Sequence, residues 1–124
     1  AACPYVDVLE GDRWVRQGEI LRYQVGPTQD RWQRLGISTE ASHTVHIRLS
    51  EEKDEVTHLD SVHLLVDEHP VLPVSCQQAD SLPDYCEPDS VYEIMERGDI
   101  IELAFEVPPS SETFTLEAKG YYTH

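Results

Sequence analysis

The sequence has few basic residues and no long apolar run. Of its 124 residues, 9 are Lys or Arg and 24 are Asp or Glu, which gives a formal net charge of −15. Such a chain repels nucleic-acid phosphates and anionic membrane surfaces, so we expect no nucleic-acid binding. No apolar stretch approaches the roughly 20 residues that a membrane-spanning helix needs, and the longest, VHLLV at 62–66, has the length of a strand. The sequence therefore predicts no membrane span.

Cysteine is also scarce, with only Cys3, Cys76 and Cys86. None has the C-x-x-C or C-x-x-C-H spacing of zinc, redox or haem sites. Cys76 and Cys86 flank a polar, proline-containing segment, and small domains outside the cytoplasm commonly close such loops with a disulfide. We therefore expect a Cys76–Cys86 disulfide. Cys3 would then be free or paired with another chain, unless it replaces one of these two.

No recognisable catalytic motif is present. No serine lies in a G-x-S-x-G nucleophile turn. The acidic residues are so numerous that no single carboxylate pair is favoured for glycoside hydrolysis. We therefore expect a protein that is not an enzyme.

Apolar and polar residues alternate in several segments, which is the pattern of half-buried strands. A chain of this length forms one domain around one core. With no helix long enough for a βαβ crossover, the sequence predicts a single all-β domain over 1–124, an antiparallel sandwich of the immunoglobulin-like or jelly-roll-like kind with six to eight strands. The expected strands are a hairpin from 5–9 and 13–25, followed by 44–49, 59–67, 99–107 and 114–123.

Other segments carry weaker patterns. Residues 28–37 are expected to form a loop that packs Trp32 on the core, and 51–58 a charged connection. Residues 68–98, with four prolines, are expected to be irregular, as one long loop or two short strands, with one helical turn ended by Gly98. The alternation places Ser61 and Glu117 on the solvent side.

Five of the six histidines lie between His43 and His69. If 44–49 and 59–66 pair as antiparallel neighbours, His46 lies directly opposite His63, with Cβ atoms about 4.5–5.5 Å apart. Two such imidazoles can share Zn²⁺ or Cu²⁺. The alternative is a pair of exposed strand histidines without a metal.

Acidic residues crowd the connection between two of these strands. Ca²⁺ needs six to eight oxygen ligands, and this stretch lacks the glycine and spacing of a calcium loop. The alternatives are therefore a calcium site and an ordinary solvated loop that protects a sheet edge. The residues concerned are Glu51, Glu52, Asp54, Glu55 and Asp60.

Aromatic residues offer a further candidate site. Binding modules of the β-sandwich type use exposed aromatic rings to stack sugars, whereas in a small β-domain tryptophan more often fills the core. Both readings stay open for Trp14, Trp32, Tyr23, Tyr121 and Tyr122.

Three segments contain motifs that recur in other proteins. They are CPYVDVLEGDRWV near the start, HIRLSEEKDEVTHLDSVHLLVDEHP in the middle, and RGDIIELAFEVPP with FTLEAKGYY at the end. In this order they resemble a module of bacterial secreted and cell-surface proteins. The resemblance implies an extracytoplasmic β-domain and no activity. One departure is visible, because Glu68 stands between Asp67 and His69, where the module has a D-H-P ending.

We therefore expect a non-catalytic, secreted or cell-surface module with a structural or protein-interaction role, including that of a subunit in an extracellular assembly. Cys3 on an N-terminal arm, or strand addition at an open edge, would link the copies. A ligand-binding module for Ca²⁺ or carbohydrate is the alternative, and an enzyme accessory domain is a third. The start AACPYV, without Met, is typical of a mature chain whose targeting signal has been removed.

Overall fold

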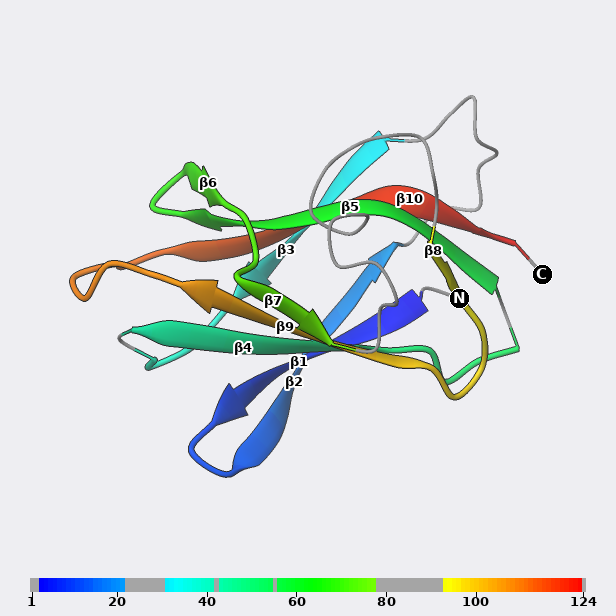
Figure 1. Ribbon diagram of the computed structural model, residues 1–124, viewed down its shortest axis with the longest axis horizontal. Coiled ribbons are helices and arrows are strands. Elements are labelled where there is room, and N and C mark those ends of the chain that lie inside the picture. Colours follow the sequence, from blue (N-terminus) through cyan, green and yellow to red (C-terminus); the bar gives the residue numbers. More distant parts are fainter. Residues whose placement is uncertain (1–2, 22–30, 42, 55, 78–92, 124) are drawn as a thin grey trace.

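The chain folds into two antiparallel β-sheets packed face to face (Figure 1). A computed structural model describes residues 3–21, 31–41, 43–54, 56–77 and 93–123, and none of these is helical. The predicted all-β sandwich is confirmed. Sheet 1 has the order β2 (Arg13–Leu21), β1 (Cys3–Glu10), β4 (Thr44–Ser50), β9 (Ile100–Glu106) and β7 (Ser75–Gln77), and sheet 2 has the order β3 (Arg31–Ile37), β10 (Phe114–Thr123), β5 (Val56–Val66) and β6 (His69–Val71), with β8 (Glu93–Met95) also paired to β5.

More strands form in the described residues than the six to eight expected. Seven of the ten are seven residues or longer, and β6, β7 and β8 have three residues each. These three fall in 68–98, where an irregular segment was expected. The helical turn expected there is wrong over 93–95, which pair with β5 as strand β8. Such short strands form because a longer neighbouring strand offers backbone hydrogen bonds. Their sequences therefore need no alternation of apolar and polar residues, and sequence patterns do not predict them.

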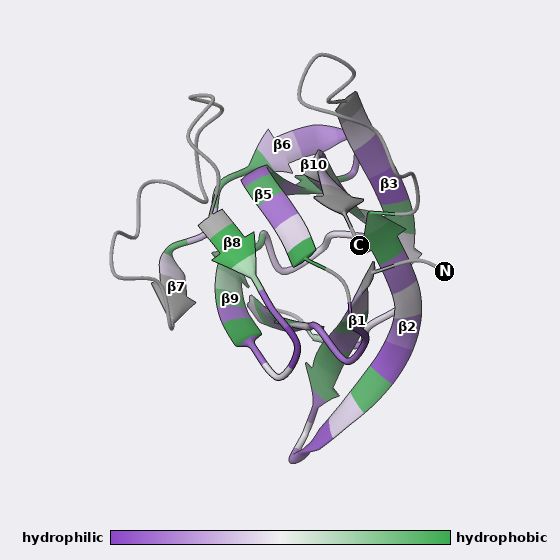
Figure 2. Cartoon of the chain, turned by 90° about the vertical axis from the view of Figure 1, so that its right-hand side faces the viewer, coloured by the Kyte–Doolittle hydropathy of each residue, from purple (hydrophilic) through white to green (hydrophobic). Residues whose placement is uncertain are grey.

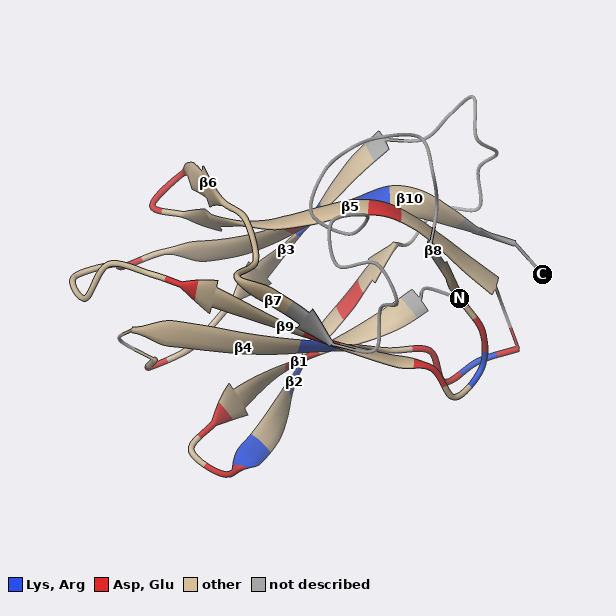
Figure 3. Ribbon diagram, in the orientation of Figure 1, with Lys and Arg blue, Asp and Glu red and all other residues tan. Residues whose placement is uncertain are grey.

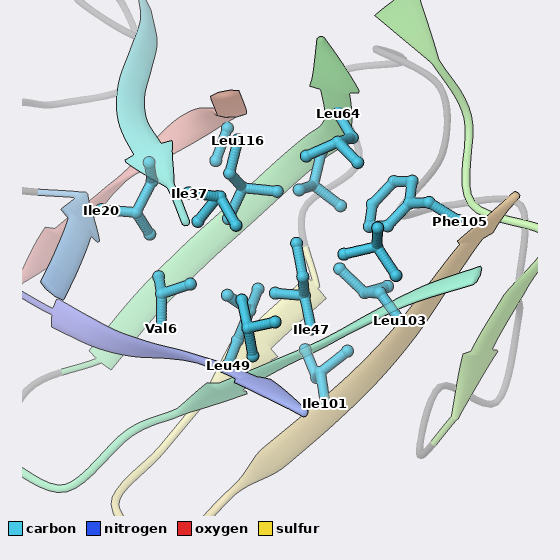
Figure 4. Close-up of a cluster of buried hydrophobic side chains, with 14 of the residues drawn as sticks. Val6, Ile20, Ile37, Ile47, Leu49, Leu64, Ile101, Leu103, Phe105 and Leu116 are labelled. Carbon is cyan, nitrogen blue, oxygen red and sulfur yellow. The ribbon is translucent and has the colours of Figure 1, made fainter. Parts of the chain in front are cut away.

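The core lies between the two sheets and is built from the alternating residues (Figure 4). Val45, Ile47 and Leu49 of β4 point inward as predicted, and Phe105 of β9 is fully buried. A buried side chain of this size contributes about 1.5–3 kcal/mol relative to exposure. The inward sets of the other long strands are also confirmed: Val62, Leu64 and Val66 of β5, Ile101 and Leu103 of β9, and Phe114, Leu116 and Ala118 of β10.

The solvent-facing prediction is wrong for two polar residues of sheet 2. Ser61 is fully buried and Glu117 is only 7% exposed. Both lie on the outer face of sheet 2, on β5 and β10 in the middle of the sheet. Long side chains of β3 lie over this face, where Trp32 packs on His63 and Arg34 pairs with Glu117, and a period-two pattern cannot show such contacts.

The acidic connection after β4 also contains a buried carboxylate. Glu51 is 1% exposed, and its carboxylate accepts hydrogen bonds from the Lys53 backbone N–H at 3.1 Å and the Thr57 hydroxyl at 2.8 Å. Its own backbone is joined to Gly98 and Asp99 by two hydrogen bonds. Glu51 therefore ties the end of β4 to the start of β5 and to the turn before β9, instead of facing solvent.

Residues 31–37 form strand β3, so the predicted loop is wrong over that part of 28–37. The strand pairs with β10 over seven residues, from Ile37 opposite Phe114 to Arg31 opposite Gly120. Trp32 lies on the outer face of sheet 2 and is 36% exposed, and it does not fill the core. The partner strand determines this structure, because the polar residues on both sides of Trp32 leave the segment without a strand pattern of its own.

Two hairpins have two-residue turns. The first joins β1 to β2 through Gly11 and Asp12, as predicted, and Gly11 has a left-handed φ of 65°. The second joins β5 to β6 through Asp67 and Glu68, with φ values of 49° and 70°. Left-handed backbone is unusual for residues other than glycine. Glu68, the residue that interrupts the D-H-P ending, is the second residue of this hairpin turn. Figure 3 shows acidic residues at both turns.

The Asp67 carboxylate supports the second turn. Its Oδ1 accepts hydrogen bonds from the backbone N–H groups of Thr113 at 2.8 Å and Glu112 at 3.0 Å. These bonds, that of Thr113 foremost, lower the pKa of Asp67 below its ordinary value. A carboxylate whose pKa is depressed by folding stabilises the native state above its unfolded pKa of about 3.9, and this stabilisation is lost as the pH falls through the folded-state pKa.

We therefore predict that Asp67→Asn lowers the melting temperature at pH 7 but flattens its fall between pH 5 and pH 2. Asn tolerates left-handed backbone and still accepts hydrogen bonds, so the turn is kept and only the charge is lost. Thermal melts followed by circular dichroism across this pH range measure the effect. Glu68→Gln is the matched control, since it removes a charge from the same turn without touching these bonds. A constant difference between Asp67→Asn and wild type at all pH values would contradict the prediction.

Candidate functional site

The two histidines proposed as metal ligands lie in different sheets. His46 is on β4 in sheet 1, opposite Ala104 of β9, and His63 is on β5 in sheet 2, opposite Glu117 of β10. Strands β4 and β5 do not pair, so the assumed register is wrong and the shared Zn²⁺ or Cu²⁺ site loses its geometric basis. Consecutive strands often pair, but here the chain crosses from one sheet to the other between them.

His63 instead belongs to a polar cluster on the outer face of sheet 2. The Glu117 carboxylate lies 2.5 Å from His63 Nε2 and 2.5 Å from Arg34 Nε. The ring of His63 also packs against Trp32, with centroids 4.6 Å apart. Each side chain of this cluster contacts another through an ion pair, a hydrogen bond or ring packing. The cluster lies over the middle of the sheet.

The acidic residues proposed for calcium do not converge. Glu51 is turned inward as described above, Glu52 pairs with Arg16 at 2.9 Å, and Asp54 pairs with Arg97 at 3.0 Å. Asp60 lies on β5, with Lys119 Nζ 4.0 Å away, and Glu55 is outside the described residues. Over the described ranges, no group of three or more His, Cys, Asp or Glu could hold a metal ion.

The cysteine predictions fall outside what the structure describes. Cys86 lies in 78–92, and the side chains of Cys3 and Cys76 are likewise outside it. The Cys76–Cys86 disulfide and the intermolecular Cys3 thiol therefore stay predictions.

The aromatic residues proposed as one sugar platform are divided between the sheets. Trp14 lies on the outer face of sheet 1, and Trp32 on that of sheet 2. Tyr121 of sheet 2 is 7% exposed and stacks on His58, with ring centroids 4.4 Å apart. Tyr23 and the side chain of Tyr122 are outside the described residues. A single platform of the five is therefore wrong, and Trp14 stands beside a hollow.

That hollow lies on the outer face of sheet 1, where one residue from each strand forms a row across the sheet. Trp14 of β2 is opposite Leu9 of β1, and Ala104 of β9 is opposite both His46 of β4 and Ser75 of β7. Leu9 and His46 lie on adjoining strands and line the same space. Small side chains at Ala104 and Ser75 leave room between larger neighbours. The hollow has a volume of about 160 Å³.

Glu102 and Leu103 complete the lining of the hollow. Glu102 belongs to the next row of the sheet, opposite Arg48 of β4. The side chains of Glu102, His46 and Ser75 form no hydrogen bond or ion pair with any part of the chain that the structure describes. The lining therefore combines an aromatic ring and apolar side chains with three polar groups that have no described partner, which is the composition of small-ligand sites.

A layer of cations and aromatic rings borders the hollow. The Arg48 guanidinium lies 4.5 Å from the Trp14 ring centroid, and the Arg16 guanidinium 4.2 Å from that of Tyr5. The Asp7 carboxylate, 4% exposed, lies between the two arginines, 2.7 Å from Arg16 Nε and 3.5 Å from Arg48 Nη2. These contacts hold the indole of Trp14 in place.

Arg48 keeps one unused donor. Its Nε is buried without a hydrogen-bond partner, in a side chain that is 28% exposed. A third cation of this layer is Lys53, whose pKa is raised above its ordinary value by hydrogen bonding to Glu19. Each of the three cations is thus paired with a carboxylate.

The sequence pointed to Trp14 and His46 but not to the site they share. Glu102 could be assigned only to the outward set of β9, and Ala104 and Ser75 carry no signal by themselves. The hollow comes from the register of five neighbouring strands, and period-two patterns do not contain the register.

No protein-family model matches this chain, and no curated protein or solved structure matches it either. Among the described residues, no helix is long and apolar enough to cross a membrane.

Proposed function

We propose that the protein is a non-catalytic structural or protein-interaction module that acts outside the cytoplasm, including as a subunit of an extracellular assembly. The observation that best supports this role is the position of the protein's exposed apolar residues. Of the five large apolar side chains that are exposed in the described part of the chain, four lie on β8, at the start of β9, or in the connection between β6 and β7. They are Leu72, Val74, Ile94 and Ile100, here called the apolar side.

The apolar side coincides with incompletely covered strand edges. On the edge away from β10, strand β5 pairs with β8 at 57–59 and with β6 at 64–66, and no described strand covers 61–63. Among the described strands, β7 pairs with β9 over 102–104. Figure 2 shows β7 and β8 on this side, away from β2 and β3. Strand edges that lie beside exposed apolar side chains favour association by strand addition.

The location outside the cytoplasm is supported by the resemblance to the bacterial surface module. An apolar side of this kind supports a role in association, because exposed apolar residues that gather on one side, unlike scattered ones, mark interaction sites. A second copy of the chain is the simplest partner, since each copy offers the same edge.

Sedimentation velocity over a range of protein concentrations tests the proposal. We expect the wild-type protein to form dimers or larger species, and Val74→Asp to weaken their formation tenfold or more, because a carboxylate would be desolvated at the contact. Ser110→Asp is the matched control, since it adds the same charge at an exposed position in the connection before β10. A wild-type protein that stays monomeric at the highest concentration would overturn the proposed self-association.

A further inference from the structure

The hollow on the outer face of sheet 1 has the size of a small ligand. We infer that it binds one neutral sugar ring. Its volume of about 160 Å³ equals that of about five water molecules at roughly 30 Å³ each. Sites for drug-sized ligands are larger, about 300–1,000 Å³, so the occupant is a single ring or the terminal residue of a glycan.

The lining has the two kinds of surface that a sugar ring needs. A sugar presents apolar C–H groups on its faces and hydroxyl groups around its edge. Trp14 supplies an aromatic wall for the C–H groups, while the side chains of Leu9 and Ala104 supply an apolar floor. Aromatic side chains contribute large contact areas with defined geometry.

The polar groups in the lining suit hydroxyls. The Glu102 carboxylate accepts hydrogen bonds, the Ser75 hydroxyl both donates and accepts, and neutral His46 does one with each ring nitrogen. None of these three side chains has a hydrogen-bond partner in the described ranges, so a ligand hydroxyl would not need to displace an existing side-chain contact. Hydrogen bonds to a charged acceptor such as Glu102 are among the stronger ones.

The charge pattern around the hollow favours a neutral ligand. An anion such as a phosphate would meet the Glu102 carboxylate in the lining. A basic side chain would meet the guanidinium of Arg48, which is opposite Glu102 in the sheet and packs on Trp14. Like-charge contacts of this kind are unfavourable, whereas a sugar carries no charge to be repelled.

The aromatic wall is held before any ligand arrives. Arg48 packs on the Trp14 ring, and Asp7 fixes Arg48 and Arg16 together. A side chain already held in its binding position loses little entropy when the ligand binds. The site differs from the proposed apolar side in its residues, so the inference goes beyond the proposed function and does not depend on it.

Isothermal titration with glucose, galactose, mannose and N-acetylglucosamine tests the inference. We expect at least one of these sugars to bind, Trp14→Ala to weaken binding at least tenfold, and Glu102→Gln to weaken it about tenfold. Glu106→Gln is the matched control, because Glu106 lies on the same face of β9 outside the hollow and should leave the affinity unchanged. In a Trp32→Phe background, Trp14 is the one remaining tryptophan, and its fluorescence should respond to the sugar.

Three results would overturn the inference. The first is that none of the four sugars binds. The second is that Glu102→Gln and Glu106→Gln bind a sugar equally well, and Glu102→Gln keeps this test valid if Trp14→Ala does not fold. The third is that L-argininamide, a basic probe, binds in the hollow and the sugars do not. None of these results changes the sedimentation of the wild-type protein, so a failure here is distinguishable from a failure of the proposed self-association.

Discussion

Replacement of Gly120 by alanine should lower the free energy of unfolding by about 3 kcal/mol or more. A Cβ built on Gly120 would lie 2.3 Å from the backbone oxygen of His58 and 3.1 Å from Leu21 Cδ1. The first contact is with backbone of the neighbouring strand β5, which cannot rotate away as a side chain can. The paired strands β10 and β5 would therefore have to separate.

The position of Gly120 explains this close approach. The register of β10 against β5 shifts between Lys119 and Gly120, and a bulge bends the strand and brings backbones together. Gly36 is the matched control, because it also lies in sheet 2 but has no atom within 4 Å of a built Cβ. Since glycine weakens a strand by about 0.5–1 kcal/mol relative to alanine, Gly36→Ala should be neutral or mildly stabilising.

Urea unfolding followed by circular dichroism measures both glycine variants. Gly120→Ala should unfold at a clearly lower urea concentration than wild type, whereas Gly36→Ala should unfold at the same concentration or a higher one. A loss of less than 1 kcal/mol for Gly120→Ala would mean that the strands tolerate the methyl group and that the close approach is not a constraint. The terminal G-Y-Y of the resemblance would then have no steric reason for its glycine.

The long strands could be predicted from the sequence because each carries its own signal. In 99–107, every second residue from Ile101 to Val107 is apolar, and all of them are buried. Burial of one face alone accounts for that pattern. Strand β3 could not be predicted in this way, because its partner β10 determines its structure and Trp32 points outward.

Which strands are neighbours could not be predicted either. The segments around His46 and His63 follow one another in the chain and alternate in the same way, yet one lies in each sheet. Pairing depends on contacts between residues far apart in sequence, and a local pattern is compatible with several partners. The metal hypothesis depended entirely on the neighbour relation, so it lost its geometric basis although the assignment of both strands was right.

The candidate sugar site shows the same division between local and distant information. The outward position of Glu102 follows from alternation within β9, and that of His46 from alternation within β4. Their meeting with Trp14 in one hollow requires the strand order of sheet 1. The buried Glu51 and Glu117 are the opposite case, because their local pattern predicts exposure and contacts with other segments bury them.

Replacement of Phe105 by alanine should lower the free energy of unfolding by about 3–5 kcal/mol. Phe105 is fully buried between the sheets, opposite Val45 of β4 in the register. Alanine would leave a cavity that the surrounding strands of two sheets can close only in part. Ile94→Ala is the control, because Ile94 is 52% exposed and its truncation should cost no more than about 1 kcal/mol.

The same variant separates stability from binding. The side chain of Phe105 points into the core, whereas that of its neighbour Ala104 lines the hollow on the opposite face. Below its lowered melting temperature, Phe105→Ala should therefore bind sugar within about threefold of wild type, while Glu102→Gln should melt like wild type and bind more weakly. If Phe105→Ala lost binding while still folded, the hollow would depend on core packing, and the outer face of sheet 1 could not be treated as a preformed surface.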